Sequence, residues 1–130
     1  MYKCCLVVGS FLFVLCFYSC KKNTASLTKH VITYKITSSN YKLFTNISYT
    51  DTLGVQSSAS AFDSTSGWSK SISESYSGFT VLLHVDGQNS TTSELNYTLE
   101  IVVDGISRAR KQDSAARFNS FSAEVSAVLQ

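Results

Sequence analysis

Apolar and polar residues alternate along most of the chain after its first thirty residues. The clearest run is Leu95 to Val103, where every odd-numbered residue is apolar and only Val102 breaks the polar series between them. A period of two places successive side chains on opposite faces of a strand, so this segment is predicted to be a strand with one buried face. Asp104-Gly105 follows directly and predicts a type I′ turn, because both residues tolerate positive φ angles; Ile106 to Lys111 is the expected return strand.

The same alternation predicts four further strands, one of which stops at Asp86-Gly87, a second Asp-Gly pair. Their apolar positions are Ile32, Tyr34 and Ile36; Leu43, Ile47 and Tyr49; Phe79, Val81, Leu83 and Val85; and Phe121, Ala123, Val125, Ala127 and Leu129.

Two segments in the middle of the chain are less regular. After a turn at residues 50–54, the Ser-rich stretch from Gln56 to Ser66 is expected to be a loop or a short edge strand around Ala61 and Phe62. Gly67 to Ser75 is expected to form another strand, with Trp68 and Ile72 buried. About seven strands with turns roughly every 8 to 12 residues predict an all-β fold, an immunoglobulin-like antiparallel β-sandwich.

The first twenty residues follow a different pattern. Lys3 precedes an almost unbroken apolar run from Leu6 to Tyr18. At about 1.5 Å per residue such a helix would span roughly 20 Å, which is short of the roughly 30 Å hydrocarbon core of a bilayer. Residues 1–19 are therefore predicted to be a cleaved signal peptide rather than a permanent membrane span.

The end of this run resembles a bacterial lipoprotein lipobox. Small Ser19 precedes Cys20, and the polar segment KKN follows, although Phe17 and Tyr18 are bulkier than the usual residues of the box. The resemblance implies that Cys20 is lipidated after cleavage. Because each buried methylene contributes about 0.8 kcal/mol, two or three acyl chains would hold the protein stably on a membrane. The alternative is an ordinary secretory signal that leaves Cys20 as a spare thiol.

The cysteine count favours lipidation. All four cysteines lie at or before Cys20, so an exported domain would contain neither a disulfide nor a thiolate metal site, and an unmodified Cys20 would be a lone thiol in an oxidising compartment. We expect residues 20–28 to be the lipidated cysteine and a polar tether, and residues 29–130 to be the β-sandwich domain. No Asp follows Cys20, which by resemblance to known lipoproteins implies an outer-membrane location facing the periplasm.

The order of segments in the domain resembles that of the MmpS-like (mycobacterial membrane protein, small) domain. The matching segments are Thr33-Tyr34-Lys35-Ile36-Thr37, Ile47-Ser48-Tyr49-Thr50-Asp51, Gly67-Trp68-Ser69-Lys70 and Leu99-Glu100-Ile101-Val102-Val103-Asp104-Gly105. The resemblance implies an immunoglobulin-like sandwich that, in some members, assists a large transporter of lipids or siderophores. The chain departs from the family in three ways: Gly67 replaces a proline, a cysteine pair is missing, and the anchor is a lipid instead of a membrane helix.

Charge and candidate chemistry narrow the function further. The chain has 11 basic and 9 acidic residues without a block of either sign, which argues against nucleic acid as a partner. His30 and His84 are far apart, lack cysteine partners and have no nucleophile-elbow context, so no catalytic residues, metal ligands or cofactors are assigned. His84 is expected to be exposed or half-buried. Trp68 is expected to fill the core, with ligand stacking as its alternative.

Three further aromatic residues, Tyr41, Tyr76 and Phe118, lie near predicted strand ends and are expected to be partly exposed. Together these features predict a non-enzymatic envelope lipoprotein that is held on a membrane through Cys20. It would act as a binding or accessory module for an envelope protein, such as a component of a transport complex. The alternative is a structural lipoprotein, or one that binds a small apolar ligand, without a transporter partner.

Overall fold

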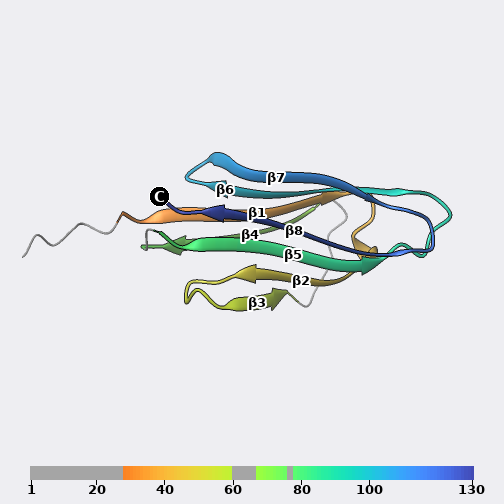
Figure 1. Cartoon of the computed structure of the whole chain (residues 1–130), viewed down its shortest axis with the longest axis horizontal. Coiled ribbons are helices and arrows are strands. Elements are labelled where there is room, and N and C mark those ends of the chain that lie inside the picture. Colours follow the sequence, from red (N-terminus) through yellow and green to blue (C-terminus); the bar gives the residue numbers. More distant parts are fainter. Residues whose placement is uncertain (1–27, 60–66, 76–77) are drawn as a thin grey trace, which may run out of the picture.

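The computed structural model describes residues 28–59, 67–75 and 78–130, and these residues form two packed β-sheets (Figure 1). A short 3₁₀ turn (Tyr41–Leu43) joins the first two strands. The strands are β1 (His30–Ser38), β2 (Phe44–Thr50), β3 (Gln56–Ala59), β4 (Trp68–Glu74), β5 (Thr80–Gln88), β6 (Leu95–Val103), β7 (Ile106–Ala115) and β8 (Ser120–Val128).

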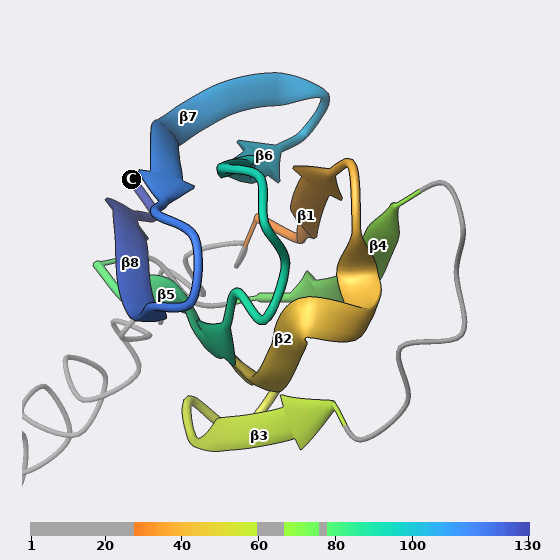
Figure 2. The same ribbon diagram turned by 90° about the vertical axis from the view of Figure 1, so that its right-hand side faces the viewer.

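The two sheets have four strands each, in the orders β4-β1-β6-β7 and β3-β2-β5-β8, and every neighbouring pair is antiparallel. Figure 2 shows the two sheets as layers seen end-on, with β7 beside β8 and β3 at the outer edge of its sheet. The predicted all-β antiparallel sandwich is confirmed. The described residues contain eight strands, so the estimate of about seven was slightly low.

The alternating residues build the core as predicted. β1 pairs with β6 so that Ile32 lies opposite Val103, and Ile36 lies opposite Leu99. These side chains and Tyr34 face the second sheet and are almost completely buried. Burial of each such side chain contributes about 1.5 to 3 kcal/mol, so this strand pair is a main source of stability.

Three aromatic rings join the two sheets at the end of the molecule far from the start of β1. Tyr97 of β6 contacts Phe44 of β2 and Phe121 of β8, with ring centroids 5.7 and 5.1 Å apart, and Phe44 lies 5.2 Å from Phe121. Edge-on and tilted pairs of this kind are favourable because the positive edge of one ring meets the negative face of another. Burial raises the pKa of Tyr97 to about 12.

The expected strand end at Asp86-Gly87 is wrong, because β5 continues through both residues to Gln88. Gly87 is buried and pairs with Phe44 and Phe121 on the neighbouring strands. A Cβ atom there would lie 2.2 Å from Cζ of Phe121 and 2.4 Å from the Leu43 carbonyl oxygen. The glycine therefore allows close packing inside a strand and does not form a turn.

Three other expectations need correction. Tyr41 is buried, since its ring stacks near that of Phe44 and its hydroxyl donates to the Ile36 carbonyl and accepts from the backbone N–H of Ser38. The Ser-rich stretch forms an edge strand earlier than expected, at Gln56–Ala59, while Ala61 and Phe62 lie outside the described residues. The return strand β7 continues to Ala115, four residues beyond Lys111.

Candidate functional site

The end of the sandwich at which β1 begins is the candidate functional site, because the predicted anchor joins the domain there. Figure 1 shows that the start of β1, the β2–β3 turn, the β6–β7 turn and the C-terminus all lie at this end, which we call the N-terminal end. Cys20, the predicted lipidation site, and the predicted signal peptide and lipobox lie outside the described residues. Nine residues separate Cys20 from His30, so a fully extended linker reaches about 35 Å.

A carboxylate fastens the start of β1 to the β6–β7 turn. Asp104 Oδ2 accepts a hydrogen bond from His30 Nδ1 at 2.7 Å, and Oδ1 accepts one from the backbone N–H of Val31 at 2.8 Å. The Asp104 N–H in turn donates to the Val31 carbonyl at 2.9 Å. The hydrogen bond from His30, together with that from Val31, holds the pKa of Asp104 below its usual value.

The predicted Asp-Gly turn is confirmed at this position. Asp104 and Gly105 both have positive φ angles, 53° and 80°, as a type I′ turn requires. Asp104 is therefore both a residue of the turn and the acceptor whose hydrogen bonds hold the start of β1 against that turn. The periodicity of the sequence predicted the turn, but nothing in it indicated that His30, 74 residues earlier, would bind Asp104.

A second carboxylate shapes the β2–β3 turn at the same end. Asp51 Oδ1 accepts from the backbone N–H groups of Leu53 and Val55, and Oδ2 accepts from the Ser57 hydroxyl at 2.7 Å. These hydrogen bonds, with that from Ser57 contributing most, lower the pKa of Asp51. The turn is thus fixed by its own aspartate, in the way that Asx turns usually form.

The C-terminus is attached to the same end. Backbone hydrogen bonds run from Gly78 N–H to the Leu129 carbonyl and from Leu129 N–H to the Phe79 carbonyl. Leu129 is buried, and the Phe79 ring packs beneath the β2–β3 turn, where a Cβ atom on Gly54 would lie 2.6 Å from it. The N-terminal end is therefore a set of turns and chain ends held by specific hydrogen bonds and packing.

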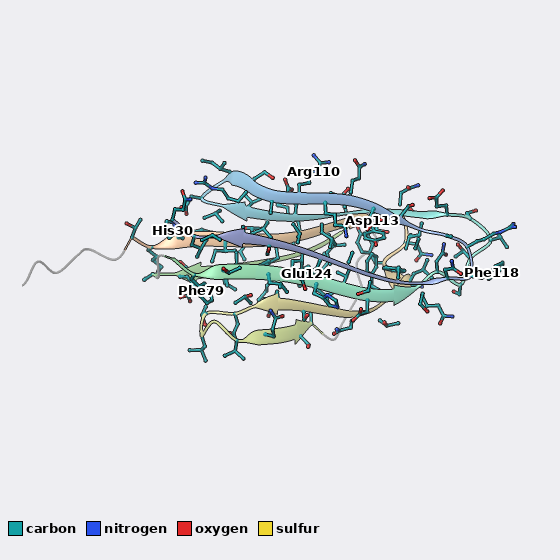
Figure 3. The ribbon with its side chains drawn as sticks, in the orientation of Figure 1. His30, Phe79, Arg110, Asp113, Phe118 and Glu124 are labelled. Carbon is teal, nitrogen blue, oxygen red and sulfur yellow. The ribbon has the colours of Figure 1, made fainter. Side chains whose placement is uncertain are left out.

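The second histidine considered in the sequence, His84, lies on the outer face of the sheet β3-β2-β5-β8. His84 on β5 is half-buried, in agreement with the sequence prediction, and it lies between two carboxylates. Its Nε2 is 3.1 Å from Asp86 Oδ1, and its Nδ1 is 3.7 Å from Glu124 Oε2 on β8. Figure 3 shows Glu124 on the strand face near the middle of the molecule, away from the N-terminal end.

The geometry around His84 is that of a structural cluster of hydrogen-bonded polar side chains. Burial raises the pKa of the Asp86 carboxyl, but three hydrogen bonds outweigh burial and hold that pKa below its usual value; the donors are Ser122, Asn46 and His84. Ser48 lies opposite His84 in the neighbouring strand, but both imidazole nitrogens are directed at carboxylates, so neither is placed to accept a proton from a serine hydroxyl. This histidine does not form a Ser-His-Asp triad.

Other candidate positions are accounted for by packing. The Trp68 ring is half-buried at the start of β4 and packs against the core, 5.8 Å from the Tyr49 ring, which contacts Tyr34, so the expected burial is only partial. Phe118 is exposed, as expected, and Tyr76 lies outside the described residues. The described ranges contain no group of three or more His, Cys, Asp or Glu side chains that could hold a metal ion.

Comparisons with known proteins add no assignment. No protein-family model matches the chain, and no curated protein matches its sequence. Across residues 28–59, 67–75 and 78–130, no helix is long and apolar enough to cross a membrane.

Proposed function

We propose that this protein is a lipid-anchored, non-enzymatic module of the bacterial cell envelope, held on a membrane through Cys20. The observation that carries the proposal is the apolar run that ends in Ser19-Cys20, followed after a nine-residue linker by the first strand of a β-sandwich. The chain thus has the order of a lipoprotein: leader, lipid-bearing cysteine, short polar tether and folded domain. The location proposed for it is the outer membrane, facing the periplasm.

The internal organisation of the domain supports a binding or accessory role more than a carrier role. Aromatic and aliphatic side chains fill the space between the sheets, including the cluster of Phe44, Tyr97 and Phe121. Among the residues described, no buried polar side-chain atom is left without a hydrogen-bond partner. The surfaces available to another protein are the outer sheet faces and the edge strands, where an added strand can pair with free backbone groups.

The resemblance to the MmpS-like domain extends this proposal to a role beside an envelope transport complex. The resemblance rests on the four short segments around Tyr34, Tyr49, Trp68 and the Asp104-Gly105 turn. In the fold, the first three of these form the ring series Tyr34–Tyr49–Trp68, with neighbouring centroids 5.5 and 5.8 Å apart. These three segments therefore pack against one another, which would explain why they occur in the same chain.

The test is the fate of Cys20. We expect Cys20→Ser to move the protein from the membrane fraction to the soluble fraction and to abolish incorporation of an alkyne-tagged fatty acid. Cys16→Ser is the matched control, since this cysteine lies in the segment that would be cut away, and it should leave both membrane attachment and labelling intact. Unchanged fatty-acid labelling in Cys20→Ser would overturn the proposal.

A further inference from the structure

Exposed apolar side chains are concentrated at the N-terminal end of the sandwich. The structure describes six large apolar residues that are exposed, and the positions of five of them in the strands and turns place them at this end. The sixth, Phe118, lies at the opposite end of the molecule (Figure 3). Single exposed apolar residues are common on protein surfaces, so the feature of interest is that five of them are grouped at one end. The five residues are Val31, Leu53, Val55, Ile106 and Val128.

Three of these residues lie in or directly after two turns, and we call them the apolar tips. Leu53, which is 81% exposed, and Val55 lie in the β2–β3 turn, and Ile106, which is 56% exposed, follows the β6–β7 turn. Hydrogen bonds hold both turns. Asp51 accepts from the backbone N–H groups of Leu53 and Val55, and Asp104 accepts from the backbone N–H of Val31 on the neighbouring strand. The apolar tips are therefore held outward in a defined arrangement, although solvation alone would favour their burial.

The position of the predicted anchor indicates that these tips would contact the membrane surface. The linker between Cys20 and His30 reaches at most about 35 Å, and it joins the domain at the end that carries the tips. Strands of nine residues, such as β1 and β8, are about 30 Å long. Because the linker joins the domain at the apolar end, that end is never more than about 35 Å from the predicted anchor, whereas the opposite end can lie about 65 Å from it.

The charged residues at the N-terminal end give it no net positive charge that would attract it to an anionic membrane. Exposed Lys29 and Arg108 lie at this end together with the carboxylates of Asp51 and Asp104, so positive and negative groups nearly cancel. A contact with lipid at this end would therefore depend on apolar side chains entering the headgroup and upper acyl region, and it would depend little on salt.

We propose that Leu53, Val55 and Ile106 insert into the interfacial region of the bilayer that carries the anchor, so that the sandwich stands on the membrane on its N-terminal end. This inference rests on the proposed lipid anchor and adds a second contact with the same membrane. In this orientation the outer faces of both sheets point sideways, parallel to the membrane surface, and the end around Phe118 points away from the bilayer. A partner protein would then approach from the side or from the far end.

The experiment uses the full-length, processed protein in vesicles of phosphatidylethanolamine and phosphatidylglycerol. Leu53→Cys, Ile106→Cys and, as the matched control, Phe118→Cys are each labelled with the environment-sensitive fluorophore NBD. Vesicles with and without lipids that carry a shallow doxyl quencher are compared. The parent chain serves as the test of the anchor, because a lipidated Cys20 cannot react with the label.

We expect NBD at positions 53 and 106 to be quenched at least twofold by the doxyl lipids, to the same extent at low and high salt, while NBD at position 118 is not quenched. Equal quenching at all three positions, or none at 53 and 106 with an unlabelled parent chain, would overturn the inference and leave the anchor in place. A blue shift at 53 without quenching would mean that a second copy of this chain covers the tip, and it would also overturn the inference. A parent chain that labels at Cys20 would refute the anchor and the inference together.

Discussion

The removal of a single buried amide, that of Asn89, should loosen the end of the sandwich far from the start of β1. Asn89 follows β5 directly and is completely buried. Its side-chain NH₂ group donates to the carbonyls of Ser93, Ala115 and Ala116 at 2.8, 2.9 and 3.2 Å. Its Oδ1 accepts from the backbone N–H and the hydroxyl of Thr91. One side chain thus holds the β5–β6 loop against the β7–β8 loop.

The loss in the free energy of unfolding in Asn89→Ala can be estimated from the carbonyl acceptors that would lose their donor. The bond to Ala115 is fully buried, and an unsatisfied buried acceptor costs about 1 to 3 kcal/mol. The bonds to Ser93 and Ala116 are partly buried, so water replaces them in part and each contributes roughly 0.5 to 1 kcal/mol. We expect a loss of about 2 to 5 kcal/mol in the free energy of unfolding, and a fall in Tm of roughly 10 to 25 °C for a domain of this size.

The isosteric variant Asn89→Asp is a sharper test of the same contacts. It keeps the shape but replaces the NH₂ group with an oxygen that faces three carbonyl oxygens, so the loss at pH 7 should exceed that of Asn89→Ala. Burial and these oxygens should raise the pKa of the new carboxyl in the folded state. Its excess destabilisation should therefore be largest at neutral pH and decrease as the pH falls through that pKa, because the protonated acid can donate one of the three bonds.

Urea unfolding followed by Trp68 fluorescence measures these differences, since this is the single tryptophan and its ring lies against Tyr49. Asn96→Ala is the control, because Asn96 is exposed on the outer face of β6, and it should change stability by less than about 0.5 kcal/mol. The reasoning fails if Asn89→Ala is as mild as the control, or if Asn89→Asp is no worse than Asn89→Ala at pH 7.

Two further predictions concern Gly87 and Asp104. Gly87→Ala should cost about 1 to 3 kcal/mol or more in urea unfolding; adding Phe121→Leu should recover only part of this, because the Leu43 carbonyl would still lie 2.4 Å from the new Cβ, and full recovery would contradict the packing. The lowered pKa of Asp104 means that its contribution to stability is present above its unfolded pKa of about 3.9 and is lost as pH falls through the lower folded value. Asp104→Asn should thus be less stable than the parent at pH 6 and show a shallower acid decline in thermal melts from pH 6 to 2, a difference that Glu94→Gln should not reproduce.

The sequence by itself determined the local elements of the fold. A period of two marked the strands that contain Ile32, Leu83 and Leu99, because the side-chain geometry of a strand demands it, and Asp104-Gly105 marked its turn because of its backbone preferences. The prediction that Cys20 is lipidated also comes from the sequence alone, since a lipobox is a short linear pattern. Local rules failed at Asp86-Gly87, where the same dipeptide type lies within a strand.

The tertiary structure decided everything that depends on which strands become neighbours. The order β4-β1-β6-β7 and β3-β2-β5-β8 depends on long-range pairing, and no local pattern specifies it. Only this order brings His30 to Asp104 and buries Tyr41 and Asn89. It also gathers Leu53, Val55 and Ile106 at the end where β1 begins, because antiparallel strands return their alternate turns to the same end of a sheet.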